Sequence, residues 1–89
     1  MSSNHIWKLR PDPTKNNWLE KLYEWRDRFG GSVEWEIIMS KNENKQIFHT
    51  AVPIIRGIRM ADCTGSGSSK KAAMKAASQK LSDQDKLTC

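Results

Sequence analysis

Apolar residues recur at helical spacing between Trp18 and Phe29, and this stripe constrains the fold most strongly. Trp18, Leu22, Trp25 and Phe29 follow one another at steps of four, three and four residues. Such steps place all four side chains on one face of a helix, which then has to be buried against a second layer. The chain is therefore expected to build a small core around an N-terminal amphipathic helix.

Both ends of this helix carry recognisable signals. Asp12 as N-cap and Pro13 at the first helical position predict its start, and Gly30-Gly31 predicts its end. Residues 1–11 show no clear period and are expected to form an N-terminal extension, ordered in part. The apolar residues of this extension that could fold back onto the core are Ile6, Trp7 and Leu9.

Two strands are expected after the helix. Residues 33–39 (VEWEIIM) begin with alternating apolar and acidic side chains, the pattern of a half-buried strand. The polar residues 40–46 (SKNENKQ) predict a hairpin loop. Residues 47–52 (IFHTAV) then predict a second strand that stops near Pro53, because proline cannot donate to a central ladder.

The rest of the chain predicts one more strand and one more helix. Gly57 marks a turn, residues 58–63 (IRMADC) form a weaker third strand, and residues 64–69 (TGSGSS) form a flexible loop. Residues 70–81 form a helix with Ser68 or Ser69 as N-cap. The residues on its small apolar face are Ala73, Ala76, Ala77 and Leu81.

The expected order is thus helix, three strands, helix. This order predicts an α+β fold in which a three-stranded antiparallel sheet carries both helices on one face. Eighty-nine residues suffice for one such domain. We expect the domain to span residues 12–82 and residues 83–89 to form a flexible tail.

Positive charge is concentrated in the last helix. The net charge is +5 with a pI near 9.5, which favours an anionic partner. Residues 67–81 contain four lysines and no acid, so they account for four of the five excess charges. Because a lysine run is often only a solvated helix face, the position of these lysines matters more than their number.

Lys70 and Lys71 stand in the first turn of this helix, where the dipole disfavours cations. A glycine-containing loop that leads into a helix N-terminus is suited to an anion. Lys71 and Lys75 are four residues apart and project from one side. The sequence therefore predicts a phosphate-binding end that fits a polyanion better than a small molecule.

Gly65–Leu81 (GSGSSKKAAMKAASQKL) resembles the C-terminal signature of the double-stranded RNA-binding domain family. That signature is a Gly-x-Gly loop followed by Ser-Lys-Lys, alanines and a closing leucine. Trp35-Glu36 is similar to the family's aromatic-Glu position and is followed by a loop and Phe48. The resemblance covers residues 12–82. The matching residues in the signature are Gly65, Gly67, Ser69, Lys70, Lys71, Ala73, Ala76, Ala77 and Leu81.

The resemblance implies a non-catalytic module that reads A-form duplex RNA by its shape and phosphates, with little sequence preference. It also implies a place within a larger RNA-processing protein. Lys70 and Lys71 match lysines that contact phosphates across the major groove, and the further candidate contacts beside them are Gly67, Ser69 and Lys75. The family's third lysine is replaced by Met74, and Lys75 is rotated from that position by about 100°.

Two further contact regions of the family are altered. The family's first helix offers a Glu and a Gln to the minor groove, and here these positions hold Lys21, or Glu20 in a register shifted by one, and Glu24. The loop lacks the family's Gly-Pro and His. The residues that would substitute there are Lys41, Asn42, Asn44 and Lys45. These departures favour an alternative: the same fold serving as a protein-interaction or dimerisation domain with weak or no RNA binding, its partner another protein or a second copy.

Other binding sites have weaker support. The loop lacks the GxxxxGK[ST] pattern of a nucleotide site. Trp18, Trp25 and Trp35 lie on apolar faces, which favours core packing over base stacking, whereas Trp7 is undecided. No apolar run approaches the roughly 20 residues of a membrane span, so no membrane contact is expected.

We expect no catalytic, metal or cofactor site. His5 and His49 have no Cys or carboxylate cluster at ligand spacing. Cys63 with His49 would lack a group to orient the base. Cys63 and Cys89 are expected to be free thiols in a reducing, intracellular compartment, the cytoplasm or the nucleus.

Overall fold

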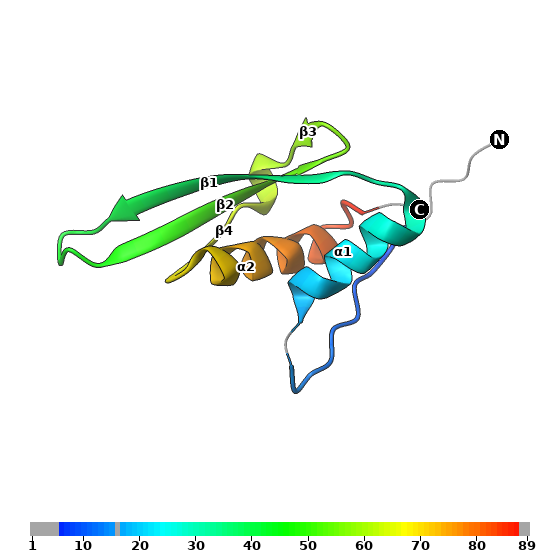
Figure 1. Cartoon of the computed structure of the whole chain (residues 1–89), viewed down its shortest axis with the longest axis horizontal. Coiled ribbons are helices and arrows are strands. Elements are labelled where there is room, and N and C mark those ends of the chain that lie inside the picture. The colour runs from blue at the N-terminus through cyan, green and yellow to red at the C-terminus, as the bar shows by residue number, and fades with distance from the viewer. Residues whose placement is uncertain (1–5, 16, 88–89) are drawn as a thin grey trace.

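The computed structural model describes residues 6–15 and 17–87 and shows an antiparallel sheet with two helices on one side (Figure 1). The α+β class and the helix–strands–helix order predicted from the sequence are confirmed, with one short strand added. The elements are α1 (Trp18–Phe29), β1 (Val33–Lys41), β2 (Ile47–Ile55), β3 (Ile58–Arg59), the 3-10 turn η1 (Ala61–Cys63), β4 (Gly65–Gly67) and α2 (Lys70–Asp83).

β2 is the central strand of the sheet. It pairs with β1 along one edge and with β3 and β4 along the other. The β1–β2 hairpin pairs every residue in order, from Val33 opposite Ile55 to Lys41 opposite Ile47. β4 pairs with the middle of β2, where Ala51 lies opposite Gly65. Residues that lie opposite each other point to the same face, so this register determines which side chains meet the helices.

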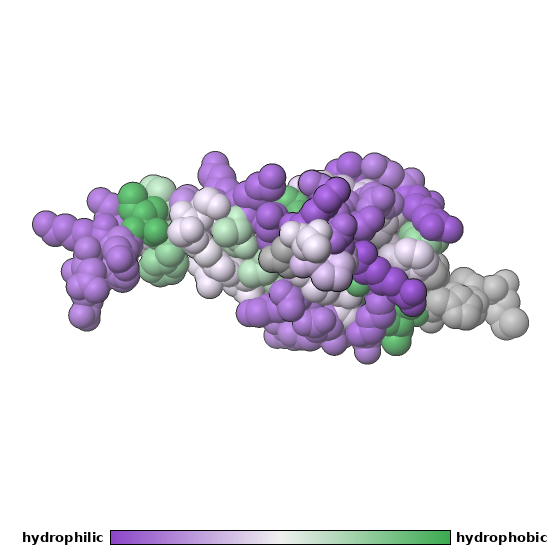
Figure 2. Space-filling model, turned by 90° about the horizontal axis from the view of Figure 1, so that it is seen from below, coloured by the Kyte–Doolittle hydropathy of each residue, from purple (hydrophilic) through white to green (hydrophobic). Residues whose placement is uncertain are grey.

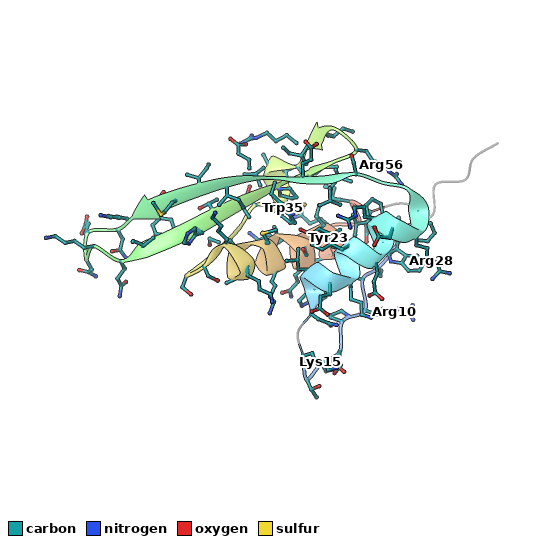
Figure 3. All side chains as sticks on the ribbon, viewed as in Figure 1. Arg10, Lys15, Tyr23, Arg28, Trp35 and Arg56 are labelled. Carbon is teal, nitrogen blue, oxygen red and sulfur yellow. The ribbon has the colours of Figure 1, made fainter. Side chains whose placement is uncertain are left out.

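The odd-numbered residues of β1 and β2 face the helices. A Cβ on Gly65, opposite Ala51, would lie within 3 Å of backbone atoms of α2. On β1, Trp35 packs against the core and donates from its indole Nε1 to the hydroxyl of Tyr23 on α1, at 3.1 Å (Figure 3). Trp35 thus ties the outer strand to α1, as expected for a core rather than a stacking tryptophan.

The core joins both helices, β2 and the two ends of the described chain. The Leu9 amide donates to Ser82 Oγ at 2.9 Å, and the Trp7 amide donates to the Leu87 carbonyl at 2.9 Å. Trp7 also packs edge-on against Phe29, with ring centroids 5.0 Å apart. Trp7 is therefore a packing residue. The buried residues of this cluster are Leu9, Leu22, Trp25, Ile55, Cys63, Leu81 and Leu87.

The predicted start of the first helix was wrong. The Asp12 carboxylate accepts from the Thr14 amide at 2.9 Å and from its hydroxyl at 2.7 Å, and the Lys15 amide donates to the Asp12 carbonyl. These bonds close a separate turn, and the two from the Thr14 hydroxyl and amide lower the pKa of Asp12. The helix begins at Trp18, after Asn17. Asp-Pro marks a turn as readily as a helix start because the same side-chain oxygen serves both.

The first two strands are longer than predicted. β1 continues through Ser40 and Lys41, and β2 continues through Pro53 to Ile55. The Pro53 carbonyl accepts from the Met60 amide and therefore points away from β1. The nitrogen of Pro53, which carries no hydrogen, points the same way. At that point β2 passes from one short partner, β3, to the other, β4, and a proline there costs no ladder bond to β1.

The region between Gly57 and Ser69 also differs from the prediction. The third strand covers only Ile58–Arg59 and is followed by η1. Gly65–Gly67, predicted as part of a flexible loop, forms β4 instead. The two glycines were mistaken for loop residues because their function, a close approach to a helix, leaves no periodic pattern.

Substituting Gly65 by alanine tests this contact. The new Cβ would lie 2.3 Å from the Ala77 nitrogen and 2.5 Å from the Ala73 oxygen, so β4 and α2 would have to separate. We expect Gly65→Ala to lower the free energy of unfolding in urea by about 2 kcal/mol or more. The exposed neighbour Ser66 provides the control, because Ser66→Ala should change the free energy of unfolding by less than about 0.5 kcal/mol. Equal stability of the two variants would contradict the packing described.

Candidate nucleic-acid interface

The start of α2 is fixed by close packing and by a cap. A Cβ on Gly67 would lie 2.7 Å from Ala72 Cβ, so β4 runs directly against the first turn of α2. Ser69 is the N-cap, and its hydroxyl accepts from the Ala72 amide at 3.1 Å. This confirms Ser69 as the cap. Lys70 and Lys71 therefore project from a first turn that is held both by β4 and by its own cap.

Within the described residues, Lys70, Lys71 and Lys75 form no ion pair and no side-chain hydrogen bond. Lys70 and Lys71 are exposed, and Lys75 is half-buried. Lys80 differs, because its ammonium group donates to the Thr64 carbonyl at 2.7 Å and so secures the turn before β4. The lysine segment thus offers three cations to a ligand, while the fourth bonds to the chain's own backbone.

The candidate contact residues on α1 are largely occupied by each other. Lys21 Nζ lies 3.0 Å from Glu24 Oε2, and Glu20 accepts a long bond, 3.4 Å, from the Asn17 amide group. Lys21 is half-buried, while both glutamates are exposed. With one lysine and two carboxylates, this region carries a net negative charge and would repel phosphates, although a carboxylate can accept from a 2′-hydroxyl.

The hairpin loop is organised by Asn42. Its side-chain oxygen accepts from the amides of Asn44 and Gln46, both at 2.9 Å, and its amide group donates to Gln46 Oε1. Asn42 is therefore committed to the turn. Lys45 adopts a positive φ of 62°. Lys41, Asn44 and Lys45 are exposed, with side chains that bond to no other described residue.

The three candidate regions follow one another along the long axis of the molecule. In Figure 1 the hairpin tip ends the sheet at one side of the molecule, and the starts of α2 and α1 follow it on the helix side of the sheet. Figure 2 faces this side and shows a surface that is mostly polar, with the hairpin tip at one end. An extended ligand could therefore touch all three regions without bending around the molecule.

Two cationic residues near α1 were missed by the sequence analysis. Arg10 and Lys15 lie on the segment that leads into α1 (Figure 3). Arg10, Lys21, Glu24 and Arg28 line an open groove between residues 6–10 and the helix. Arg28 lies over the rings of Trp7 and Phe29, 5.5 Å from each centroid. No periodicity could have signalled this groove, because it depends on how the extension folds back.

His49 lies between the hairpin tip and the start of α2. It is opposite Gly67 in the sheet and points to the helix side. Its Nδ1 is buried and has no hydrogen-bond partner within the described chain. Leaving a buried polar atom unpaired costs about 1–3 kcal/mol. The sequence indicated only that His49 is no metal ligand, and its place beside the lysine segment comes from the register of β4.

Cys63, which was considered with His49 for catalysis, lies in the core. Cys63 is a free, fully buried thiol in the core, and burial raises its pKa. A thiol of raised pKa is a poor nucleophile near neutral pH. Within residues 6–15 and 17–87 no three metal-ligating side chains come together, and no helix is long and apolar enough to cross a membrane. His5 and Cys89 lie outside the described residues.

Comparison with known proteins adds no relative. None of the family models matches the chain, and no curated protein matches it. The helix–strands–helix order is consistent with a double-stranded RNA-binding domain but does not identify one.

The ion pair on α1 can be tested by charge removal. Glu24→Gln should release Lys21 and remove a negative charge near the ligand, so we expect tighter binding to a duplex RNA of 20 base pairs at low salt. The measurement is fluorescence anisotropy of a labelled duplex. The control is Glu34→Gln, the same change on the exposed opposite side of the sheet, which should leave affinity unchanged. Weaker binding by Glu24→Gln would instead show that the carboxylate is a contact.

The state of Cys63 can be tested by thiol labelling. In a Cys89→Ser variant, which leaves Cys63 as the only thiol, we expect Ellman's reagent to react slowly at pH 8 in the folded protein. Reaction should become fast in denaturing urea, because unfolding exposes the sulfur and restores its ordinary pKa. Fast reaction without denaturant would contradict the burial of Cys63.

Proposed function

We propose that the chain is a non-catalytic module that binds double-stranded RNA, and that it belongs to a larger RNA-processing protein. The observation that carries the proposal is the lysine group at the start of α2, where Lys70 and Lys71 are exposed and unpaired among the described residues. A cluster of cations without internal partners is suited to an external polyanion.

The geometry favours a duplex over other polyanions. The hairpin tip, the start of α2 and the start of α1 line one side of the molecule (Figure 1). A-form RNA presents phosphates across its deep major groove and 2′-hydroxyls in the two flanking minor grooves. The exposed lysines of α2 suit the phosphates, whereas the polar hairpin tip suits 2′-hydroxyls. Recognition of this kind reads shape and carries little sequence preference.

The expected affinity is moderate. Lys80 is bonded within the chain, Met74 replaces a lysine, and the start of α1 holds two carboxylates against one lysine. Lys70, Lys71 and Lys75 therefore carry most of the attraction. We expect binding to be strongly salt-dependent, because each phosphate contact releases counterions.

A second function has its own support. Exposed apolar side chains on the sheet, among them Met39 and Ile47, are of the kind that bind proteins. The altered RNA-contact residues on α1 and in the hairpin loop also favour this second function. The second candidate is therefore a protein-interaction or dimerisation domain with weak RNA binding.

Paired lysine substitution separates these two functions. We expect the Lys70→Ala/Lys71→Ala double variant to bind unrelated 20-base-pair RNA duplexes about tenfold or more weakly. The slope of log K against log salt should flatten by about 0.9 for each phosphate that the variant no longer neutralises. Electrophoretic mobility shifts and anisotropy over a salt series provide both values.

The control for this experiment is Lys86→Ala. Lys86 is exposed and lies beyond the other end of α2, so its removal should barely change affinity or salt slope. Circular dichroism establishes that each variant is folded. Unchanged affinity of the double variant would refute the assignment, and the absence of any binding by the native chain would favour the second function.

A further inference from the structure

Among the described strands, none pairs with the outer edge of β1. Within the described residues β1 pairs only with β2. The Asn42 amide donates to Gln46, and the Arg56 amide donates to Ser32, so even-numbered residues form the hydrogen-bonded pairs of this hairpin. Because such pairs alternate in an antiparallel ladder, the odd-numbered residues direct their N–H and C=O groups outward. Those residues are Val33, Trp35, Ile37, Met39 and Lys41.

Apolar side chains flank this edge where the hairpin extends past the helices (Figure 1). Ile38, Met39, Ile47 and Phe48 are between 37% and 64% exposed, Met39 the most. Met39 and Ile47 point to the helix side and Ile38 and Phe48 to the opposite side. Figure 2 shows the apolar patch on the helix side, next to the polar hairpin tip. A long, apolar, unpaired strand edge is a template for another strand.

We propose that this edge binds the same edge of a second copy of the chain, with the two β1 strands antiparallel about a two-fold axis at Ile37. In this register Ile37 faces its own counterpart, Trp35 faces Met39, and Val33 faces Lys41. All five outward residues of each copy then form inter-chain backbone bonds, which joins the two sheets into one.

The side chains of β1 complement themselves in this register. On the helix side the exposed Met39 thioether meets the Trp35 ring, a favourable sulfur–aromatic contact, and two isoleucines meet on the axis. On the other side Glu34 faces Ser40, and Glu36 faces Ile38 while its charge is held by Arg59 of its own chain, at 2.7 Å. No like charges face each other, so a second copy meets the pairing rules of an antiparallel sheet.

The proposed edge shares only Lys41 with the proposed RNA contacts. It contains none of Lys70, Lys71 and Lys75, and the inference does not depend on RNA binding. Self-association and RNA binding can therefore succeed or fail separately in experiments on the same chain.

Sedimentation equilibrium over a concentration series tests the proposal. The native chain should dimerise reversibly. Met39→Lys should weaken the dimer about tenfold or more, because it removes the contact with Trp35 and buries a charge at the edge. Ile58→Lys is the matched control, because Ile58 is equally exposed at 61% but lies on β3, and it should leave the dimer unchanged.

A charge-swap pair tests the register. Ile37→Lys and Ile37→Glu each place like charges on the axis, so each variant alone should be monomeric, and an equimolar mixture should dimerise. Circular dichroism and thermal melting establish that each variant is folded. A native chain that is monomeric at every concentration would overturn the proposal, as would a dimer that Met39→Lys leaves intact. A mixture that stays monomeric while Met39→Lys weakens the dimer would overturn the Ile37 axis.

Discussion

The contact of β4 with α2 determines the rest of this structure. At Gly65 and Gly67 the strand lies so close to the helix that any Cβ would meet helix atoms at less than 3 Å. Because β4 is paired to β2 as well, the helix is held against the centre of the sheet at its N-terminal half. The first turn of α2 therefore lies beside the hairpin. The C-terminal part of α2 packs into the core with Leu81 and Trp25.

This arrangement also explains the distribution of charge. Lys80 donates to the Thr64 carbonyl, whereas Lys70 and Lys71 are exposed at the start of α2, close to the end of β4. Two cations at a helix N-terminus are opposed by the dipole, and no described carboxylate neutralises them. An external polyanion would relieve both effects. On α1 the Lys21–Glu24 pair leaves little attraction for phosphate, so the energetic centre of the proposed interface is the start of α2.

Much of the fold could be predicted because it follows from period and composition. The stripe from Trp18 to Phe29, the hairpin strands and the alanine face of α2 each leave a periodic signal. The predictions that were wrong concern details that depend on contacts with other parts of the chain. Asp12 forms a turn of its own, and Pro53 is tolerated because of where its missing N–H would point. Gly65 is a strand residue only because α2 lies against it.

The chain ends show the same limit. Leu87 lies in a polar stretch that predicted a flexible tail, yet it is fully buried and accepts a bond from the Trp7 amide. A single leucine among polar residues forms no periodic pattern, so its burial could not be predicted from the sequence. For the candidate site, the lysines could be selected from the sequence through their spacing. The commitment of Asn42 to its turn, the Lys21–Glu24 pair and the groove beside Arg10 required the assembled fold.

The most direct test of the account is a titration of the ¹⁵N-labelled chain with a 20-base-pair RNA duplex at physiological salt, followed by amide chemical shifts. We predict saturable shifts centred on Gly67 to Lys71, with smaller ones in the hairpin loop and on the exposed side of α1. A DNA duplex of the same sequence should compete poorly, because it lacks 2′-hydroxyls and A-form geometry. Shifts confined to the opposite side of the sheet, or none at saturating RNA, would contradict it.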